Sequence, residues 1–476
     1  MNLRKSIHLL IAIVCTAFLP QIDAVSPTPD GCYPNFTTAE GCKALQNLTT
    51  GAGNTAVGWY SLFSTSSGSN NTAVGAGALD LNTADNNTAV GVAALLLNTT
   101  GTNNTANGTG ALVFNNSGEG NTATGAFALY SNTDGQFNTA NGEFTLYSNT
   151  IGERNTAIGD SALYLNTEGN GNTAIGNTAL LNNTVGSGNT AVGLSALNSN
   201  LADGNTAIGS NALSSNTNGS GNTATGTGAL ALSNGDNNTA NGASALLSDT
   251  TGSGNTALGR SALADNTVGD GNTAVGWNAL SNNVSGNGNI ALGGSAGSNV
   301  ASAGNVISIG SPGADVSDSC YIGNIWQQAG GSQAVFVNAS GKLGAQVSSR
   351  RFKDEIKPMD QSSEVIYQLK PVSFRYKQEI EPARPLTFGL IAEEVNDVNS
   401  ALVVRDKQGK PFSVRYDQVN AMLLNEFLKE HRKVQELESR LAQQERQIES
   451  MAVGLQKVSA QIEMSRSTPD VATIDQ

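Results

Sequence analysis

The chain is poor in histidine, in aromatic residues and in charge. Of its 476 residues, 2 are histidine, 5% are aromatic and 13% are charged. His431 is the one histidine beyond the first 24 residues. Serine–histidine–aspartate triads, cysteine–histidine dyads and histidine-based zinc sites all need an imidazole as base or ligand. Any catalysis must therefore use other groups, and we expect neither a metal nor a cofactor.

Positive charge is scarcer than negative charge, with 25 Lys and Arg against 38 Asp and Glu. The formal net charge is −13, and Arg154 and Arg260 are the only basic residues between Lys43 and Lys342. A chain with this balance has little to attract nucleic acid or an anionic membrane. The acidic residues of the same stretch recur in no fixed register, which argues against calcium. We therefore expect no nucleic-acid partner and no membrane insertion.

Cysteine is also rare, with four residues, the first of them within residues 1–24. Residues 1–24 contain two basic residues followed by a short apolar run, which is typical of a secretory signal peptide. No later segment is apolar enough to span a bilayer. Beyond the signal, Cys32 and Cys42 are candidates for a disulfide in an oxidising compartment, and Cys320 is left over. These patterns predict a secreted or cell-surface protein.

What the chain has in abundance is a repeat of 17 residues, occasionally 16. The consensus is N-T-A-x-G-x-x-A-L-x-x-N-T-x-G-x-G, with Asn-Ile once in place of Asn-Thr, and a degenerate copy lies near Thr38. The copies open at Asn54, Asn71, Asn87, Asn104, Asn121, Asn138, Asn155, Asn172, Asn189, Asn205, Asn222, Asn238, Asn255, Asn272 and Asn289. Two short apolar stretches closed by Asn or Gly turns favour a β-solenoid coil, since a helical hairpin needs about 30 residues.

The fixed spacing of the repeat predicts which residues fill the interior of such a solenoid. Alanine and leucine should fill a narrow interior, while asparagine and threonine form ladders at the turns. One coil buries little apolar surface, so we expect several chains to share a core. The threonine ladders could bind a ligand, as in ice-binding solenoids, but satisfying the backbone at turns is the simpler interpretation.

These repeats resemble the head repeats of trimeric autotransporter adhesins over roughly residues 37–300. In that family the coils form a left-handed parallel β-roll shared by three chains. The repeat here is longer than the adhesin unit, and the family's membrane anchor is missing. The resemblance implies a homotrimer and adhesion to a cell-surface or polysaccharide receptor.

Composition changes sharply at about residue 347. Short β-like runs over 301–347 predict a neck, and beyond it the chain reads S-S-R-R-F-K from Ser348 to Lys353. With no histidine near, a desolvated lysine amine that has lost its proton can activate a serine hydroxyl. Ser348 would then attack the carbonyl of Val347 and cut the chain before itself.

This stretch resembles the S-D-x-R-x-K signature of the intramolecular chaperone auto-processing domain, a serine–lysine peptidase found at the ends of endosialidase tailspikes and in myelin regulatory factor. By position, Ser348 matches the nucleophile, Lys353 the dyad lysine and Arg351 the motif arginine. Ser349 stands where an aspartate is usual, and it is a second candidate nucleophile.

Later features agree with that family. They are a Leu-Lys-Pro-Val segment from Leu369, the segment Gly389–Val395, a hairpin turning at Gly409 and a C-terminal helix. The resemblance covers about residues 340–462. It implies a domain that drives trimerisation and then cleaves itself off.

The C-terminal helix carries a strict seven-residue apolar repeat, which predicts a coiled coil. Its a positions are Phe427, Val434, Leu441, Ile448, Leu455 and Ile462, and its d positions are Leu423, Glu430, Leu437, Gln444, Met451 and Val458. The choice of core residues does not separate two strands from three, so the trimer rests on the resemblance.

Taken together, the patterns predict a mainly β, trimeric chain with a small α+β domain near its end. The expected segments are a signal peptide (1–24), an N-terminal cap (25–53), a β-solenoid or β-roll (54–300), a β-neck (301–347), an auto-processing domain (348–416), a coiled-coil helix (417–463) and a disordered tail (464–476). The expected function is an adhesive fibre matured by autoproteolysis. A tailspike-like polysaccharide depolymerase and a structural fibre without cleavage are the alternatives.

Overall fold

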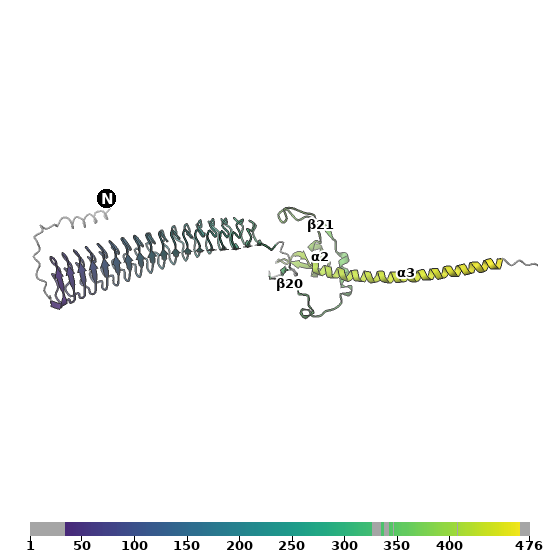
Figure 1. The fold of residues 1–476 in the computed structure, drawn as a ribbon, viewed down its shortest axis with the longest axis horizontal. Helices are drawn as coiled ribbons and strands as arrows, with labels where there is room; N and C mark the ends of the chain where they lie inside the picture. Colours follow the sequence, from purple (N-terminus) through teal and green to yellow (C-terminus); the bar gives the residue numbers. More distant parts are fainter. Residues whose placement is uncertain (1–33, 326–334, 338–341, 346, 407, 467–476) are drawn as a thin grey trace, which may run out of the picture. The chain divides into compact units, whose positions relative to one another are not determined.

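The computed structural model describes residues 34–325, 335–337, 342–345, 347–406 and 408–466. The chain divides into two compact units, Met1–Gln328 and Ala329–Gln476 (Figure 1). The predicted signal peptide, Cys32 and the end of the predicted tail, residues 467–476, lie outside the described residues. The first unit begins with a short 3-10 turn, η1 (Pro34–Phe36).

The first unit is a parallel β-solenoid in which every coil contributes one strand of three residues. Each strand pairs in parallel and in register with the next, so Thr-Ala-x faces Thr-Ala-x along almost the whole stack. The strands are β1 Thr38–Glu40, β2 Thr55–Val57, β3 Thr72–Val74, β4 Thr88–Val90, β5 Thr105–Asn107, β6 Thr122–Thr124, β7 Thr139–Asn141, β8 Thr156–Ile158, β9 Thr173–Ile175, β10 Thr190–Val192, β11 Thr206–Ile208, β12 Thr223–Thr225, β13 Thr239–Asn241, β14 Thr256–Leu258, β15 Thr273–Val275, β16 Ile290–Leu292, β17 Ile307–Ile309 and β18 Cys320–Ile322. The predicted mainly β solenoid of 17-residue coils is confirmed.

Each coil closes its interior within one chain. In the coil that opens at Asn172, the side chains of Ala174, Ala179 and Leu180 are fully buried, and the same three positions are buried along the stack. The predicted filling by alanine and leucine is therefore confirmed. The expectation that several chains share this interior is not met, because one chain already removes it from water. Any contact between copies of the chain would therefore use the outer faces.

The Ala-Leu stretch lies in a turn rather than in a second strand. Leu180 has a φ of 52°, in the left-handed region that side chains with a Cβ avoid. Its N–H donates to the carbonyl of Ala196 in the next coil at 3.0 Å, and its side chain reaches the interior. Burial of leucine and a coil-to-coil hydrogen bond together offset the strain. The alternating pattern alone did not reveal this turn.

Glycine is required where neighbouring coils come closest. Gly176 has a φ of 131°, and a Cβ built on it would lie 2.6 Å from the carbonyl oxygen of Gly193 in the next coil. The same clash recurs at the corresponding glycine of most coils. A side chain at this position would force the stack apart.

Two columns of buried asparagine run through the solenoid. In one, the Asn138 N–H donates to Asn121 Oδ1 at 2.9 Å. In the other, Asn149 Nδ2 donates to Asn132 Oδ1 at 2.7 Å and to the Gly152 carbonyl at 3.0 Å. These side chains satisfy backbone groups that the turns would otherwise leave buried and unpaired. The predicted asparagine ladders are confirmed.

Replacing one rung of the second column should weaken the stack. In Asn149→Ala, Asn132 Oδ1 and the amide of Asn166 each lose a buried partner, because Asn166 Nδ2 donates to Asn149 Oδ1 at 2.7 Å. We expect a loss of about 3 kcal/mol, since each buried polar group left unpaired costs roughly 1–3 kcal/mol. Thermal unfolding followed by circular dichroism measures it. The exposed Asn218→Ala is the matched control, and equal effects in both variants would contradict the ladder's role.

The solenoid continues beyond residue 300, where the sequence motif of the repeat ends. β17 and β18 extend the same parallel sheet. At this end, Asp315 Oδ1 accepts hydrogen bonds from the N–H groups of Ala301, Ser302 and Ala303 at 2.9, 2.8 and 2.7 Å. These backbone donors lower the pKa of Asp315 to about 2. An ionised aspartate thus caps the final turns.

The described part of the second unit starts with a pair of short strands and continues as a small mixed α and β fold. Its elements are β19 Val335–Val337, β20 Leu343–Ala345, η2 Arg350–Phe352, η3 Asp360–Gln368, β21 Val372–Phe374, β22 Thr387–Gly389, α2 Ala392–Val398, η4 Ser400–Leu402, β23 Val403–Arg405, β24 Pro411–Val414 and α3 Tyr416–Arg466. Among the residues that the structure describes, three antiparallel pairs form, β19 with β20, β21 with β22, and β23 with β24. The last pair turns at Gly409, with a φ of 82°, as predicted.

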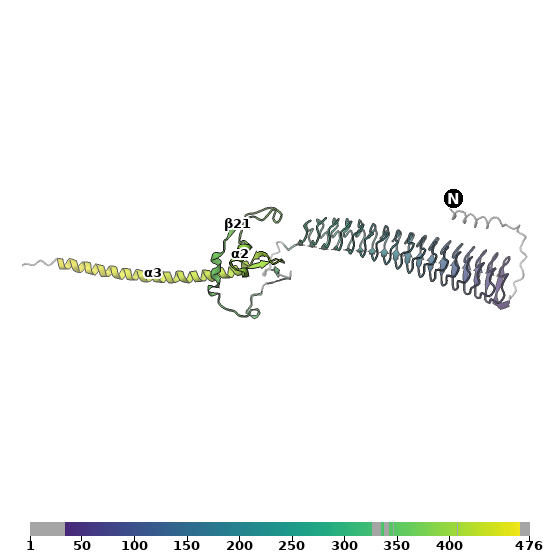
Figure 2. The same cartoon turned by 180° about the vertical axis from the view of Figure 1, so that it is seen from behind.

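The buried core of this unit is small. Val395, Leu402, Val403 and Val414 form it, with partly buried neighbours from η3 and α3 packed around them. α3 then runs on as one uninterrupted helix (Figure 2). Among the residues that the structure describes, no helix is both long and apolar enough to cross a membrane.

Candidate functional site

The turn η2 brings the two predicted catalytic side chains together. The N–H of Phe352 donates to the Ser349 carbonyl at 3.0 Å, and the N–H of Lys353 donates to the Arg350 carbonyl at 3.1 Å. This single turn carries Lys353 back toward Ser348, five residues earlier. Lys353 Nζ lies 3.3 Å from Ser348 Oγ. Local backbone folding is therefore enough to form the pair.

Both members of the pair are exposed in the single chain, as is Val347, whose carbonyl is the predicted target. Exposure leaves the scissile peptide accessible. It also leaves Lys353 in water, whereas a lysine that serves as a base has to be desolvated to lose its proton. The single chain thus places a nucleophile and a base within reach of each other, but it does not shield the lysine amine from water.

The two supporting residues take different positions. Ser349 caps η2 with its backbone, and its side chain makes no capping hydrogen bond. The guanidinium carbon of Arg351 lies 4.7 Å from the centre of the Phe352 ring, a cation–π contact. Arg351 therefore stacks on its neighbour rather than on the Ser348–Lys353 pair. Nothing in its contacts assigns it a direct part in proton transfer.

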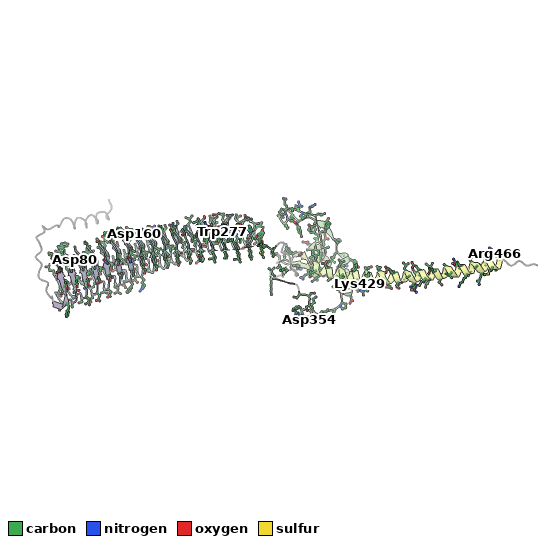
Figure 3. All side chains as sticks on the ribbon, in the orientation of Figure 1. Asp80, Asp160, Trp277, Asp354, Lys429 and Arg466 are labelled. Atoms are coloured by element: carbon green, nitrogen blue, oxygen red, sulfur yellow. The ribbon has the colours of Figure 1, made fainter. Side chains whose placement is uncertain are left out.

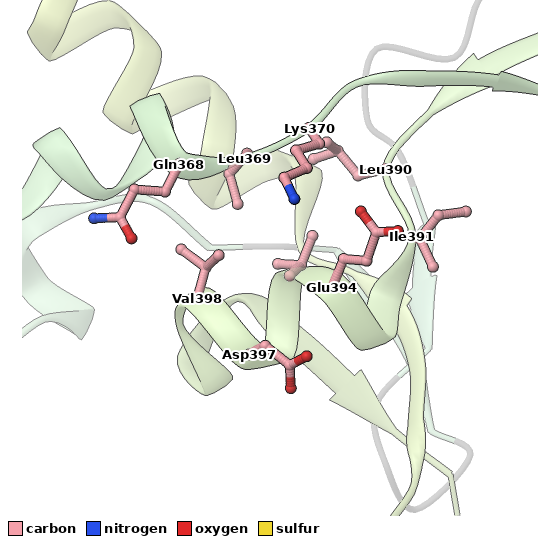
Figure 4. A pocket seen from close by; sticks show the side chains of 9 residues that line it. Gln368, Leu369, Lys370, Leu390, Ile391, Glu394, Asp397 and Val398 are labelled. Carbon is pink, nitrogen blue, oxygen red and sulfur yellow. The ribbon is translucent and has the colours of Figure 1, made fainter.

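A separate hollow lies where the loop after η3 meets α2. Its walls are Gln368, Leu369, Lys370, Leu390, Ile391, Glu394, Val395, Asp397 and Val398. In Figure 4 the Lys370 amine and the Glu394 carboxylate both point into it. None of the nine lining residues is a serine, a cysteine or a histidine. This hollow therefore offers no hydroxyl of serine, no thiol and no imidazole.

A buried polar cluster joins η3 to the start of α3, and it was not among the predicted site residues. Ser363 Oγ donates to Glu426 Oε1 at 2.5 Å, and Tyr367 donates to Oε2 at 2.9 Å. Lys429, labelled in Figure 3, donates to Oε1 at 2.7 Å. The hydrogen bond from Lys429, followed by that from Ser363, lowers the pKa of Glu426. The cluster holds the helix against the small domain.

The predicted heptad positions of α3 face solvent in the single chain. Most apolar a and d side chains, among them Phe427, Leu441, Ile448 and Leu455, are more than half exposed. A row of this kind at seven-residue spacing is stable only when other helices cover it. The helix is present over the predicted range. The coiled coil itself stays a prediction.

The remaining site predictions concern metal and cysteine. Within the described ranges, no group of three or more His, Cys, Asp or Glu side chains is arranged to hold a metal ion. Cys42 and Cys320 are exposed, and neither is joined to another cysteine of the described residues. Because Cys32 lies outside the described residues, its disulfide with Cys42 stays a prediction.

Comparison with known proteins bears on this same segment. Residues 348–404 match the family described as the chaperone of endosialidase. The match begins at Ser348 and includes Lys353, the hairpin β21–β22 and α2. No curated protein and no solved structure matches the chain significantly. The suspected tailspike-type chaperone domain is thus supported, behind a long parallel β-solenoid.

Proposed function

We propose that this chain is a secreted or surface-exposed homotrimeric fibre whose C-terminal chaperone domain drives trimerisation and then cleaves itself off between Val347 and Ser348. A β-solenoid followed by a chaperone-of-endosialidase domain fits a trimeric fibre with a C-terminal chaperone. The observation that carries the cleavage is the 3.3 Å contact between Lys353 Nζ and Ser348 Oγ, at the start of the matching segment.

The chemistry needs only this chain and one water. Ser348 Oγ attacks the carbonyl carbon of Val347 while Lys353 Nζ takes the hydroxyl proton. The bond from Val347 to the Ser348 nitrogen breaks, and that nitrogen takes the proton from Lys353. An ester then joins the Val347 carbonyl to Ser348 Oγ, and water hydrolyses it. The products are a fibre ending at Val347 and a fragment that begins at Ser348.

Assembly supplies what the single chain lacks. The exposed row on α3 gathers three chains, and their association buries the surface around Ser348 and Lys353. Desolvation leaves the lysine amine neutral and turns it into a base. Cleavage then follows assembly, and release of the chaperone leaves the fibre kinetically trapped. The adhesive role rests on the likeness of the repeats to adhesin heads, with a cell-surface or polysaccharide receptor.

The row on α3 gives a direct test of assembly. In the double variant Leu441→Asp and Ile448→Asp, two charges enter the seam of the coiled coil, where each must be desolvated without a partner. We expect the trimer to fall to monomer, with a loss in association of at least about 100-fold. Light scattering after gel filtration measures the mass of the particle.

Gln443→Asp with Ser450→Asp adds the same two charges on another side of the helix and serves as the control. This variant should remain trimeric. If the seam variant stays trimeric as well, α3 does not drive assembly.

A further inference from the structure

The outer face of the solenoid sheet is free of charge over almost its whole length. This sheet face consists of the first and third residues of each strand from β2 to β18, whose side chains point away from the interior. No acidic or basic residue occupies either position. The turns, by contrast, carry Asp and Glu side chains such as Asp160, labelled in Figure 3. Soluble edges and faces ordinarily carry charge to prevent association.

Aliphatic side chains concentrate at the C-terminal end of this face. In most coils a threonine at the first strand position lies beside Val, Ile or Leu at the third. In the last three strands, β16 to β18, Ile or Cys replaces the threonine at the first position. The resulting C-terminal patch consists of Ile290, Leu292, Ile307, Ile309, Cys320 and Ile322. Its five aliphatic members are each 37–49% exposed in the single chain.

The register places these residues side by side. Ile290 pairs with Ile307 and Leu292 with Ile309, and the next step pairs Ile307 with Cys320. Together they form two adjacent apolar columns on neighbouring strands about 4.8 Å apart. A contiguous apolar patch of this kind on a very polar chain is characteristic of an interaction site.

Charge and spacing indicate what covers the face. A partner rich in charge would find no opposite charge on the sheet face. Copies of this chain each carry a net charge of −13 and repel one another, except where they meet across an uncharged surface such as this face. The side chains repeat once per coil, and an identical solenoid has the same repeat along its whole length. Copies in register therefore match at every coil, as identical strands do in stacked sheets.

The area is sufficient for a specific contact. Seventeen strands at about 4.8 Å and three residues at about 3.3 Å make a strip roughly 80 Å long and 10 Å wide. That is about 800 Å² on each chain, which is what a standard protein–protein interface buries per partner.

We propose that the sheet face is the surface through which copies of this chain pack on one another, starting at the C-terminal patch. The proposal rests on the trimeric fibre proposed above and names the surface that makes it. The patch lies in the coils nearest in sequence to the chaperone segment, so chains gathered by α3 meet there first. The rest of the face then aligns coil by coil.

Cys320 makes the contact measurable, because it lies within the patch and its thiol is exposed. In the full chain with Cys15, Cys32 and Cys42 changed to serine, Cys320 is the only thiol. A short bismaleimide should link two copies through Cys320. The matched control moves the thiol to a turn by adding Cys320→Ser and Val268→Cys, since Val268 is exposed but lies on no strand.

On a denaturing gel, we expect at least tenfold more linked dimer from Cys320 than from the Val268→Cys control. Equal linking in both would overturn the proposal. Light scattering on the same samples separates the claim that the chain is trimeric from the claim that the sheet face makes the contact. A trimer in which Cys320 does not link refutes the sheet face and leaves the fibre standing, and a monomer refutes both.

A second variant probes the patch itself. Leu292→Glu with Ile309→Glu places charges on the face, while Val185→Glu with Val268→Glu places them on turns. The first pair should lower the thermal unfolding midpoint of the solenoid in the full chain, and the second should not. Circular dichroism at several protein concentrations makes the measurement. Equal midpoints in the two variants would contradict packing through the patch.

Discussion

Ser348→Ala is expected to leave the chain uncut, and Lys353→Met is expected to do the same. Alanine removes the nucleophilic hydroxyl that lies 3.3 Å from the lysine amine. Methionine keeps most of the lysine stem but cannot accept a proton. Because a nucleophile and its base act as a unit, losing either should slow cleavage at least about 1,000-fold. Denaturing gels of purified protein, sampled over days, measure the uncut fraction.

Two controls keep this result specific. Ser349→Ala removes the neighbouring hydroxyl, and since the Ser349 side chain makes no capping bond, η2 should be undisturbed. Lys357→Met removes another exposed lysine of the same segment. Both controls should cleave normally. If Ser349→Ala blocks cleavage while Ser348→Ala does not, then the nucleophile is Ser349.

Asp249→Asn is expected to stabilise the solenoid at neutral pH. Asp249 occupies a rung of the second asparagine column and is fully buried. Ser233 Oγ donates to it at 2.6 Å, and Asn266 Nδ2 donates at 2.9 Å. Burial nonetheless raises its pKa from 3.8 to about 6. At pH 7 the fold must therefore keep an ionised carboxylate in its interior.

The sign of the pH effect follows from proton binding. Between pH 4 and 6 the folded chain keeps a proton on Asp249 that the unfolded chain has lost, so stability falls as pH rises through this window. A shift of about two pKa units corresponds to roughly 3 kcal/mol. Asparagine has no such proton, and its amide can donate to the Gly252 carbonyl as Asn149 does to Gly152. The variant should gain about 3 kcal/mol at pH 7 and little at pH 4.

Thermal unfolding at the two pH values separates this effect from general charge removal. Asp265→Asn removes an exposed acid from the neighbouring coil and should change little at either pH. Asp315, whose pKa lies at about 2, affects stability over a different pH range. Its contribution to folding stability is lost only as pH falls from 4 toward 2. A gain for Asp249→Asn that is equal at pH 4 and pH 7 would contradict the buried carboxylate.

Periodicity made the solenoid predictable. Ala174, Ala179 and Leu180 recur every 17 residues and fill the interior, because identical spacing stacks identical residues. The left-handed turn at Leu180 was not predictable, since hydrophobic pattern carries no information on φ. The sheet's extension to β18 was missed for a related reason. Its strands are spaced 17 and then 13 residues apart, and the turn residues of the repeat are gone.

The candidate site was accessible to sequence reasoning because it is local. Ser348 and Lys353 are five residues apart, and one turn brings them together. The cluster around Glu426 joins residues 63 positions apart, Ser363 and Glu426, which no local pattern reveals. Asp249 was likewise overlooked, because a single Asp in place of Asn looks neutral in a repeat. Its importance comes from its burial, which raises the pKa of its carboxyl group.

The measurement that tests the central claim most directly is the intact mass of the wild-type protein after purification and denaturation. We predict two polypeptides, one ending at Val347 and one comprising residues 348–476, with Ser348 as the first residue of the second on N-terminal sequencing. A single uncut chain recovered from trimeric protein would contradict self-cleavage, and a second fragment beginning at any other residue would contradict Ser348 as the nucleophile.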